Sequence, residues 1–431
     1  MGLKLRPVLV FMMLTLFAAS ASAYELQTAK GGDLPLRWPG RTVELAISDS
    51  IPTSDNVRGA DQAFDAIQRA ARAWSEVSGI EIVFTGSKEL SISPPGRKGD
   101  GVSLITIAQT PENLLLFTGS DAARPAVTRL FFDSKGRILE ADIVLNPYFS
   151  TSTDGSPGSF DLESTMVHEL GHALGLGHSE VLGASMRGNV ARNGHFSLPF
   201  TSIRTLSADD IAGIRALYGP SSDDPTCCGS LSGTFGRVES IGTDRVVWLE
   251  TKETGAVAAM TRVTKSGDFW IDGLQPGIYE VFTRDPFAGN GAEVLGTVEI
   301  VKNETSESET NTSGKSSRSV LSAAGFNGQL SSLAVPVNSG RSFKIYLAGT
   351  GQLSDLEIRV SAPGIRVDGA SLEYPDYGKD ISVAAFVIDI EDAVPEGEYS
   401  VRIYENGVLV DCLVGALTIE SEPNPWSHRQ L

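Results

Sequence analysis

The segment from residue 168 to residue 178, which reads HELGHALGLGH, constrains this chain more than any other stretch. His168 and His172 are four residues apart, so on a helix they lie on one face, one turn apart. Gly175 can adopt the left-handed conformation that ends a helix, after which the chain can turn and present His178. Three imidazoles with an open fourth position are typical of catalytic rather than structural zinc sites. The sequence therefore predicts that His168, His172 and His178 bind Zn²⁺.

Glu169 lies one residue from the first predicted ligand, off the ligand face but beside it. From there its carboxylate can hold and deprotonate a water molecule at the metal without joining the coordination shell. The alternative is a helix with incidental surface histidines. That alternative is disfavoured because the chain has five histidines in all, and three of them are in this segment. We therefore predict that Glu169 is the general base of a zinc hydrolase.

The residues that follow resemble the metzincin metalloproteases, and among them the matrixin branch. Ser179 comes directly after the third histidine, and Met186 lies eight residues past His178, where the family has a methionine beneath the metal. The resemblance implies an α+β catalytic domain, with a twisted mixed sheet and three helices, that cleaves peptide bonds in protein or peptide substrates. It also implies that Met186 forms an apolar floor under the metal and takes no part in proton transfer.

Residues 206–219 read independently as a helix, with Ser207 and Asp210 forming a capping box at its start. The stretch also resembles the last helix of a matrixin catalytic domain. In that family the first Asp of the helix braces the Met-turn and the second can meet the amino terminus of the chain. By resemblance these residues would be Asp209 and Asp210. Without the family, both are ordinary carboxylates at a helix start.

Upstream, residues 57–77 read as an amphipathic helix and residues 80–84 as a strand, a pair that resembles the start of a matrixin catalytic domain. Residues 126–132 and 138–145 read as a hairpin. In matrixins the first of these strands is the sheet edge over the cleft, where substrate adds as an antiparallel strand. A plain inner strand is the alternative interpretation of residues 126–132.

Two further features concern metals and specificity. Asp154, Gly155 and Asp161 could hold Ca²⁺, as loops of this family often do, although turns rich in Asp and Gly are usually only turns. No histidine precedes His168, so the second, structural zinc of animal matrixins cannot be built from histidines here. After Met186 the chain reads Arg-Gly-Asn, not the tyrosine-bearing wall that lines the main specificity pocket in many relatives.

The amino-terminal segment indicates where the protein is located. Residues 1–23 read as a signal peptide, with Lys4 and Arg6 before an apolar run that is too short to span a bilayer. We therefore expect a secreted, extracellular or periplasmic protein that begins near Tyr24. The net charge of −18 argues against nucleic acid and anionic membrane surfaces as partners.

A chain of 431 residues is too long for one core, and its composition changes near residue 221. The catalytic domain would span residues 24–220. Short alternating runs separated by turn signals then predict two all-β sandwich domains. The resulting division is a prealbumin-like β-sandwich over 228–302, a flexible linker over 303–319, an Ig-like β-sandwich over 320–420 and a tail over 421–431.

The three cysteines leave two disulfide pairings open. One is a long-range bond to Cys412, and the other is a direct bond between Cys227 and Cys228, which is strained and rarer. For function, the sequence favours a secreted zinc metalloendopeptidase. The alternative is a surface-binding or adhesion protein with a protease-like scaffold, whose β-modules recognise a surface or matrix ligand.

Overall fold

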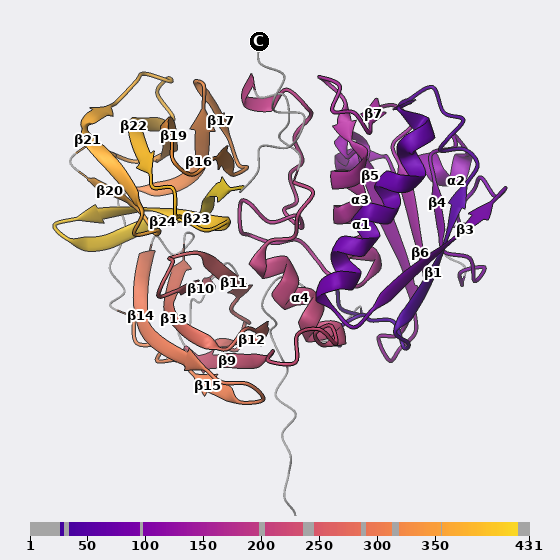
Figure 1. The fold of residues 1–431 in the computed structure, drawn as a ribbon, viewed down its shortest axis with the longest axis horizontal. Coiled ribbons are helices and arrows are strands. Elements are labelled where there is room, and N and C mark those ends of the chain that lie inside the picture. Colours follow the sequence, from indigo (N-terminus) through magenta and orange to yellow (C-terminus); the bar gives the residue numbers. More distant parts are fainter. Residues whose placement is uncertain are drawn as a thin grey trace, which may run out of the picture.

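The computed structural model describes residues 26–29, 34–94, 98–197, 203–235, 245–285, 290–312, 319–354 and 356–420. The predicted signal peptide over 1–23 and the tail over 421–431 lie outside these residues. The chain folds into an α+β domain followed by two β-sandwiches, which confirms the predicted fold class (Figure 1). Within the described ranges, no helix is both long and apolar enough to cross a membrane.

The first domain contains a five-stranded mixed sheet with the strand order β3-β1-β4-β6-β5. Its first four strands are parallel, and β5 joins the edge antiparallel to β6. The five strands are β1 (Thr42–Ser48), β3 (Glu81–Ser87), β4 (Leu104–Thr106), β5 (Ala126–Phe132) and β6 (Ile138–Leu145). A smaller sheet contains β2 (Val57–Arg58), β7 (Thr151–Ser152) and β8 (Phe160–Asp161).

Three longer helices accompany this sheet: α1 (Ala63–Val77), α3 (Leu162–Ala173) and α4 (Ala208–Tyr218). The short elements are α2 (Pro111–Leu114) and the 3₁₀ turns η1 (Ala60–Gln62), η2 (Gly119–Ala123) and η3 (His195–Ser197). The helix predicted over 57–77 begins later than expected. Residues 57 and 58 pair as β2, and Gly59 with φ of 70° then redirects the backbone before η1 and α1.

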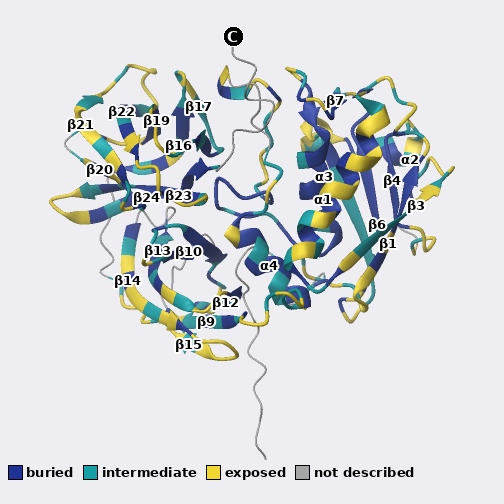
Figure 2. Ribbon diagram, viewed as in Figure 1, coloured by how far each residue is buried: buried dark blue, intermediate teal, exposed yellow. Residues whose placement is uncertain are grey.

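Helix α3 is the central helix of this domain, with ten of its twelve residues buried (Figure 2). Helix α1 packs along it, and Trp74 of α1 is fully buried between them. The Trp74 indole N–H donates to the carbonyl of Val167 at 2.9 Å. The aromatic ring therefore fills the space between the helices while its polar atom remains hydrogen-bonded, as burial requires.

The first sandwich packs two sheets with the orders β11-β10-β13-β14 and β12-β9-β15. The strands are β9 (Gly229–Thr234), β10 (Val246–Thr251), β11 (Val257–Arg262), β12 (Asp268–Leu274), β13 (Gly277–Asp285), β14 (Asn290–Ile300) and β15 (Thr305–Glu307). Helix α4 lies against β11 and β12, and apolar side chains of α4 and of this sandwich belong to one continuous core. The first domain and the first sandwich are therefore not separated by solvent.

The second sandwich has the sheet orders β17-β16-β19-β22-β21 and β18-β24-β23-β20. Its strands are β16 (Val320–Phe326), β17 (Gln329–Ser331), β18 (Val335–Val337), β19 (Ser342–Thr350), β20 (Glu357–Val360), β21 (Ile365–Glu373), β22 (Ser382–Ile390), β23 (Gly397–Glu405) and β24 (Val408–Ile419). Its core also contains Leu182 and Phe196, which belong to the loop that follows the histidine segment. Figure 1 shows this loop in magenta between the two lobes of the molecule.

The predicted flexible linker over 303–319 is wrong for residues 305–307. These residues form β15, which pairs in parallel with β9. Ser230 N–H donates to Glu304 O at 3.0 Å, and Ser308 N–H donates to Ser232 O at 2.8 Å. Backbone hydrogen bonds hold this edge strand while most of its side chains stay exposed, so it carries no apolar periodicity. Residues 313–318 of the predicted linker lie outside the described part of the chain.

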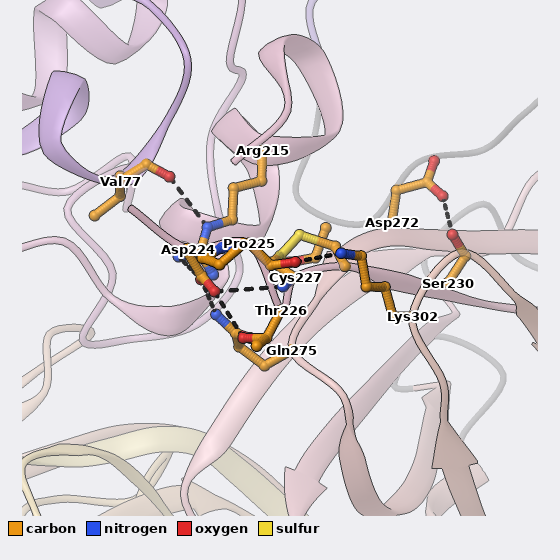
Figure 3. The surroundings of a disulfide bond; sticks show 12 residues. Val77, Arg215, Asp224, Pro225, Thr226, Cys227, Ser230, Asp272, Gln275 and Lys302 are labelled. Carbon is orange, nitrogen blue, oxygen red and sulfur yellow. Dashed lines mark hydrogen bonds and ion pairs between the residues drawn. A yellow bond between two sulfur atoms is a disulfide. The ribbon is translucent and has the colours of Figure 1, made fainter. Parts of the chain in front are cut away.

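Of the two disulfide pairings left open, the structure forms the direct bond between Cys227 and Cys228 (Figure 3). Cys412 is a buried free thiol on β24. Beside the disulfide, Asp224 accepts a hydrogen bond from Arg215 of α4 at 2.8 Å and another from Gln275, which follows β12. The segment that joins the first domain to the first sandwich is therefore held to both of them through Asp224.

Gly273 tests how closely β12 approaches α4. It has φ of 70°, and a β-carbon there would collide with the carbonyl oxygen of Ala212. We expect Gly273→Ala to lower the free energy of unfolding by about 2–4 kcal/mol, since backbone strain and overpacking add. Gly407→Ala is the matched control, because Gly407 has φ of 76° with nothing within 4 Å, and it should cost about 1–2 kcal/mol. Equal losses in chemical denaturation would contradict this contact.

Candidate metal centre

Helix α3 carries the first two histidines of the segment on one face. It begins at Asp161, whose carboxylate accepts a hydrogen bond from the Ser164 N–H at 2.8 Å and caps the helix. It ends before Gly175, which has φ of 103°, and a β-carbon there would collide with the carbonyl oxygen of Leu36. Gly175 is therefore required both by its conformation and by the backbone of Leu36 packed against it, and the turn brings His178 back over α3.

The three histidines converge as the sequence predicts. Ligating atoms of His168, His172 and His178 all lie within 4.8 Å of one another. Nε2 of His172 and Nε2 of His178 are 3.2 Å apart. In the described part of the chain, this is the one group of three or more His, Cys, Asp or Glu residues that could hold a metal ion.

Two of the rings are oriented by backbone carbonyls. Nδ1 of His168 lies 2.8 Å from Ser185 O, and Nδ1 of His172 lies 2.8 Å from Leu176 O. A carbonyl oxygen only accepts, so each Nδ1 carries the proton and each Nε2 presents its lone pair. Such carbonyl contacts behind a ligating ring fix its tautomer and direction, as in metal centres generally.

The surroundings keep the imidazoles neutral. Burial lowers the pKa of His168, and burial together with the neighbouring histidines places the pKa of His172 well below its usual value. Burial is also the main cause that lowers the pKa of His178, to about 4. A metal ion requires the neutral form of the ring, and these three rings hold that form at neutral pH. The donor set therefore fits a tetrahedral zinc ion with one further position.

Glu169 lies beside the histidine group, is 4% exposed, and is held by the edge strand of the sheet. The hydroxyl of Thr128 on β5 donates to the Glu169 carboxylate at 2.6 Å. Burial raises the pKa of Glu169 to about 7, and the Thr128 hydrogen bond opposes that rise. Thr128 was not predicted as a site residue, since nothing in its local sequence indicates that β5 brings it to α3.

Met186 lies beneath α3 and is 1% exposed. A β-carbon at Gly171 of α3 would collide with Met186 Sδ and would lie 2.8 Å from Trp74. Ser179 N–H donates to Met186 O at 2.8 Å, which closes the turn between His178 and Met186. Gly171 therefore allows the helix to rest directly on the methionine.

The matrixin family profile matches residues 121–219 of the chain. Metalloendoproteinase 1 of Glycine max is 31% identical over 193 residues, which cover 43% of this chain and 54% of the relative. Metalloendoproteinase 2-MMP of Arabidopsis thaliana is 29% identical over 198 residues, covering 42% of this chain and 43% of the relative. The N-terminal domain is matrixin-like.

Other relatives agree with this assignment. Human matrix metalloproteinase-20 is 26% identical over 184 residues, with 43% of this chain and 32% of the relative covered. The chain thus spans about half or less of the length of these relatives. A solved putative membrane anchored protein from Corynebacterium diphtheriae aligns over 46% of this chain and 60% of its own, at 9% identity. Its TM-score of 0.17 is too low to carry an argument.

In this matrixin-like domain the role predicted for Asp209 belongs to Asp210, and Asp209 has other partners. Asp210, not Asp209, braces the Met-turn: its carboxylate accepts from Ser185 N–H at 2.8 Å and from Met186 N–H at 3.1 Å. Asp209 instead accepts from the Ser179 hydroxyl at 2.6 Å and from Met260 N–H of β11 at 2.8 Å. Asp210 also accepts a hydrogen bond from the Ser207 N–H in the capping box of α4. This contact keeps its carboxylate at the start of the helix, where it faces the Met-turn.

Aromatic and amide side chains fasten the carboxyl end of α3, and these contacts were missed by sequence reasoning. The Trp38 indole donates to Ala173 O at 2.9 Å, and the Tyr218 hydroxyl donates to Leu174 O at 2.6 Å. The Gln27 amide donates to Leu176 O at 3.0 Å. These donors satisfy carbonyls that a helix end leaves free, and so hold the turn that leads to His178.

The two aspartates proposed for Ca²⁺ bind other groups of the protein. Asp154 accepts hydrogen bonds from the backbone N–H and the hydroxyl of Ser156, at 3.0 and 2.6 Å. Asp161 caps α3 and pairs with Arg204 at 2.5 Å. These contacts give no support to calcium at this turn.

The predicted edge position of β5 is confirmed by the strand order. In the described part of the chain, β5 pairs with β6 on one side only.

Gly171→Ala tests the contact between α3 and Met186. We expect a loss of about 1–2 kcal/mol in the free energy of unfolding, because overpacking against Met186 and Trp74 outweighs the better helix propensity of alanine. Combining it with Met186→Ala removes one of the colliding atoms, so the double variant should be less destabilised than the sum of the single variants. Additive losses in urea denaturation would contradict the close approach.

Asp209 gives the stability a pH dependence. Burial, with the charge of Asp210, raises its pKa to about 7 from an ordinary value of 3.8. The folded state therefore holds this proton where the unfolded state releases it, so the contribution of Asp209 to stability falls as pH rises between these values. Asp209→Asn removes this dependence. Its free energy of unfolding relative to the parent should improve from about pH 5 to about pH 8, and a constant difference would contradict the assignment.

Proposed function

We propose that this chain is a secreted zinc-dependent endopeptidase that hydrolyses peptide bonds in proteins or peptides. The observation that carries the proposal is the convergence of three neutral imidazoles with the Glu169 carboxylate beside them. The matrixin-like character of the domain and the metalloendoproteinases among its relatives support the same reaction class. The signal-like residues 1–23 support export from the cytoplasm.

His168, His172 and His178 would hold the zinc through Nε2, with the Nδ1 protons of His168 and His172 donated to Ser185 O and Leu176 O. When bound, the zinc supplies Lewis acidity, which polarises the scissile carbonyl and makes a water molecule more acidic. The rings act as oriented, neutral donors because burial keeps protons off them. Met186 packs under the helix that carries two of these rings and provides no titratable group.

Glu169 takes a proton from the attacking water and delivers it to the leaving amine. Its raised pKa suits both steps, since a group near neutrality can accept and return a proton at working pH. The Thr128 hydroxyl binds one carboxylate oxygen at 2.6 Å and so orients the other toward the reaction. Thr128 is therefore a positioning residue for the base.

The position of β5 is evidence that the substrate is a polypeptide. It has one unpaired edge, and Thr128 places that edge beside Glu169. An extended peptide can add to such an edge through main-chain hydrogen bonds, which bind the backbone of many sequences alike. Selection among substrates then requires side-chain pockets near the histidines.

Glu169→Gln is the direct test of the proposed base. The variant should retain zinc in metal analysis and lose casein cleavage by a factor of roughly 10²–10⁴, the usual contribution of a general base. Glu163→Gln is the matched control, because Glu163 is a buried carboxylate on the same helix that pairs with Arg69 at 2.7 Å. Cleavage at the parent rate by Glu169→Gln, or parent activity that a chelator leaves intact, would overturn the proposed function.

A further inference from the structure

A hollow of about 820 Å³ opens beside the histidine group. Its walls come from residues 120–125 before β5, Phe160 of β8, residues 188–195 after the Met-turn, and residues 331–333 of the second sandwich. Gly188 lies against the ring of His178, where a β-carbon would be 3.2 Å from Nδ1. One wall of the hollow, at Gly188, therefore lies against the ring of a predicted metal ligand, and another wall belongs to the C-terminal sandwich.

Hydrogen bonds to the loop after His178 hold the wall from the second sandwich in place. The Asn189 amide donates to the Ser332 hydroxyl at 2.6 Å. Deeper in the interface, the Asn327 amide donates to Phe196 O at 2.8 Å, and Phe196 is buried in the sandwich core. Leu182 N–H also donates to Val414 O of β24 at 3.1 Å. The sandwich is thus docked on the loop that lines the hollow.

The lining of the hollow is basic. Among the described residues that line it are the guanidinium groups of Arg124 and Arg192 and no carboxylate. Arg192 is stacked at 4.7 Å over Phe149 and 4.5 Å over Phe160, and donates to Gly158 O at 2.9 Å. Its position is therefore fixed. Arg124 forms an ion pair with Asp121 at 3.0 Å, and Asp121 is not among the residues that line the hollow.

Arg124 also lies close to the proposed reaction site. It is two residues before Ala126, the first residue of β5, and β5 carries the Thr128 that contacts Glu169. A carboxylate that entered the hollow would meet two positive groups and could form charge-assisted hydrogen bonds, which are stronger than neutral ones. An acidic side chain is therefore the occupant that the lining favours.

We propose that this hollow is a subsite for a substrate side chain next to the cleaved bond, that residues 331–333 of the second sandwich complete its wall, and that it selects aspartate or glutamate. The inference rests on the proposed endopeptidase activity and names its substrate class. It also assigns the C-terminal sandwich a role in specificity. Residues 331–333, which begin 145 residues after Met186 in the sequence, form part of the wall of the hollow.

The test is cleavage-site profiling of the purified full chain on a peptide library, followed by a matched pair of peptides with Glu or Gln at the preferred position. We expect kcat/KM to be at least about tenfold higher for Glu than for Gln, as charged hydrogen bonds allow. Arg192→Gln should abolish that ratio and Arg192→Lys should keep part of it. Arg359→Gln, which removes an exposed arginine paired with Glu357 at 2.6 Å on β20, should leave the ratio unchanged.

The sandwich wall is tested by Ser332→Phe, which places a ring at the hollow. It should lower kcat/KM for the Glu peptide by about tenfold or more through KM, whereas Ser222→Phe on the exposed linker should not. Cleavage without preference for acidic side chains, or a preference untouched by both Arg192→Gln and Ser332→Phe, would overturn this inference alone. Absence of cleavage of every library peptide by zinc-loaded protein would overturn the proposed function and the subsite with it.

Discussion

The contact between helix α3 and the turn at Met186 is the constraint on which the histidine site depends. Gly171 lets the helix rest on the methionine, and Ser185 of the same turn orients His168 through its carbonyl. Asp210 of α4 then holds the backbone N–H groups of Ser185 and Met186. The turn is therefore held between α3 and α4, and the ring of His168 takes its direction from it. A site of this kind is pre-organised, which favours tight metal binding and catalysis alike.

The β-sandwiches are structurally joined to this site. Asp209 links Ser179, directly after His178, to the backbone of Met260 in the first sandwich. Val181 and Ala184 lie in one apolar cluster with side chains of both sandwiches, such as Trp248 and Val414. The loop between His178 and η3 thus serves as part of the cores of the C-terminal modules. Changes in these modules can reach the histidine site through direct contacts, without any long pathway.

The sequence predicted those parts of the site that depend on local spacing. His168, His172 and His178 converge as expected because helix geometry and one glycine turn determine their positions. Parts that depend on distant segments were missed or wrong. The pairing of Thr128 with Glu169 depends on how β5 packs on α3. That Asp210 rather than Asp209 braces the Met-turn depends on which neighbour packs against each carboxylate. Strand β15 was missed because its backbone pairs while its polar side chains carry no periodic signal.

The central claim is that three imidazoles of this chain bind one zinc ion. X-ray absorption spectroscopy at the zinc edge of the purified, metal-loaded full chain tests it most directly. The structure predicts one zinc per chain with three histidine nitrogens at about 2.0 Å and one further light ligand. A first shell that contains sulfur, fewer than three imidazoles, or a protein that retains no zinc under saturating supply would contradict the account.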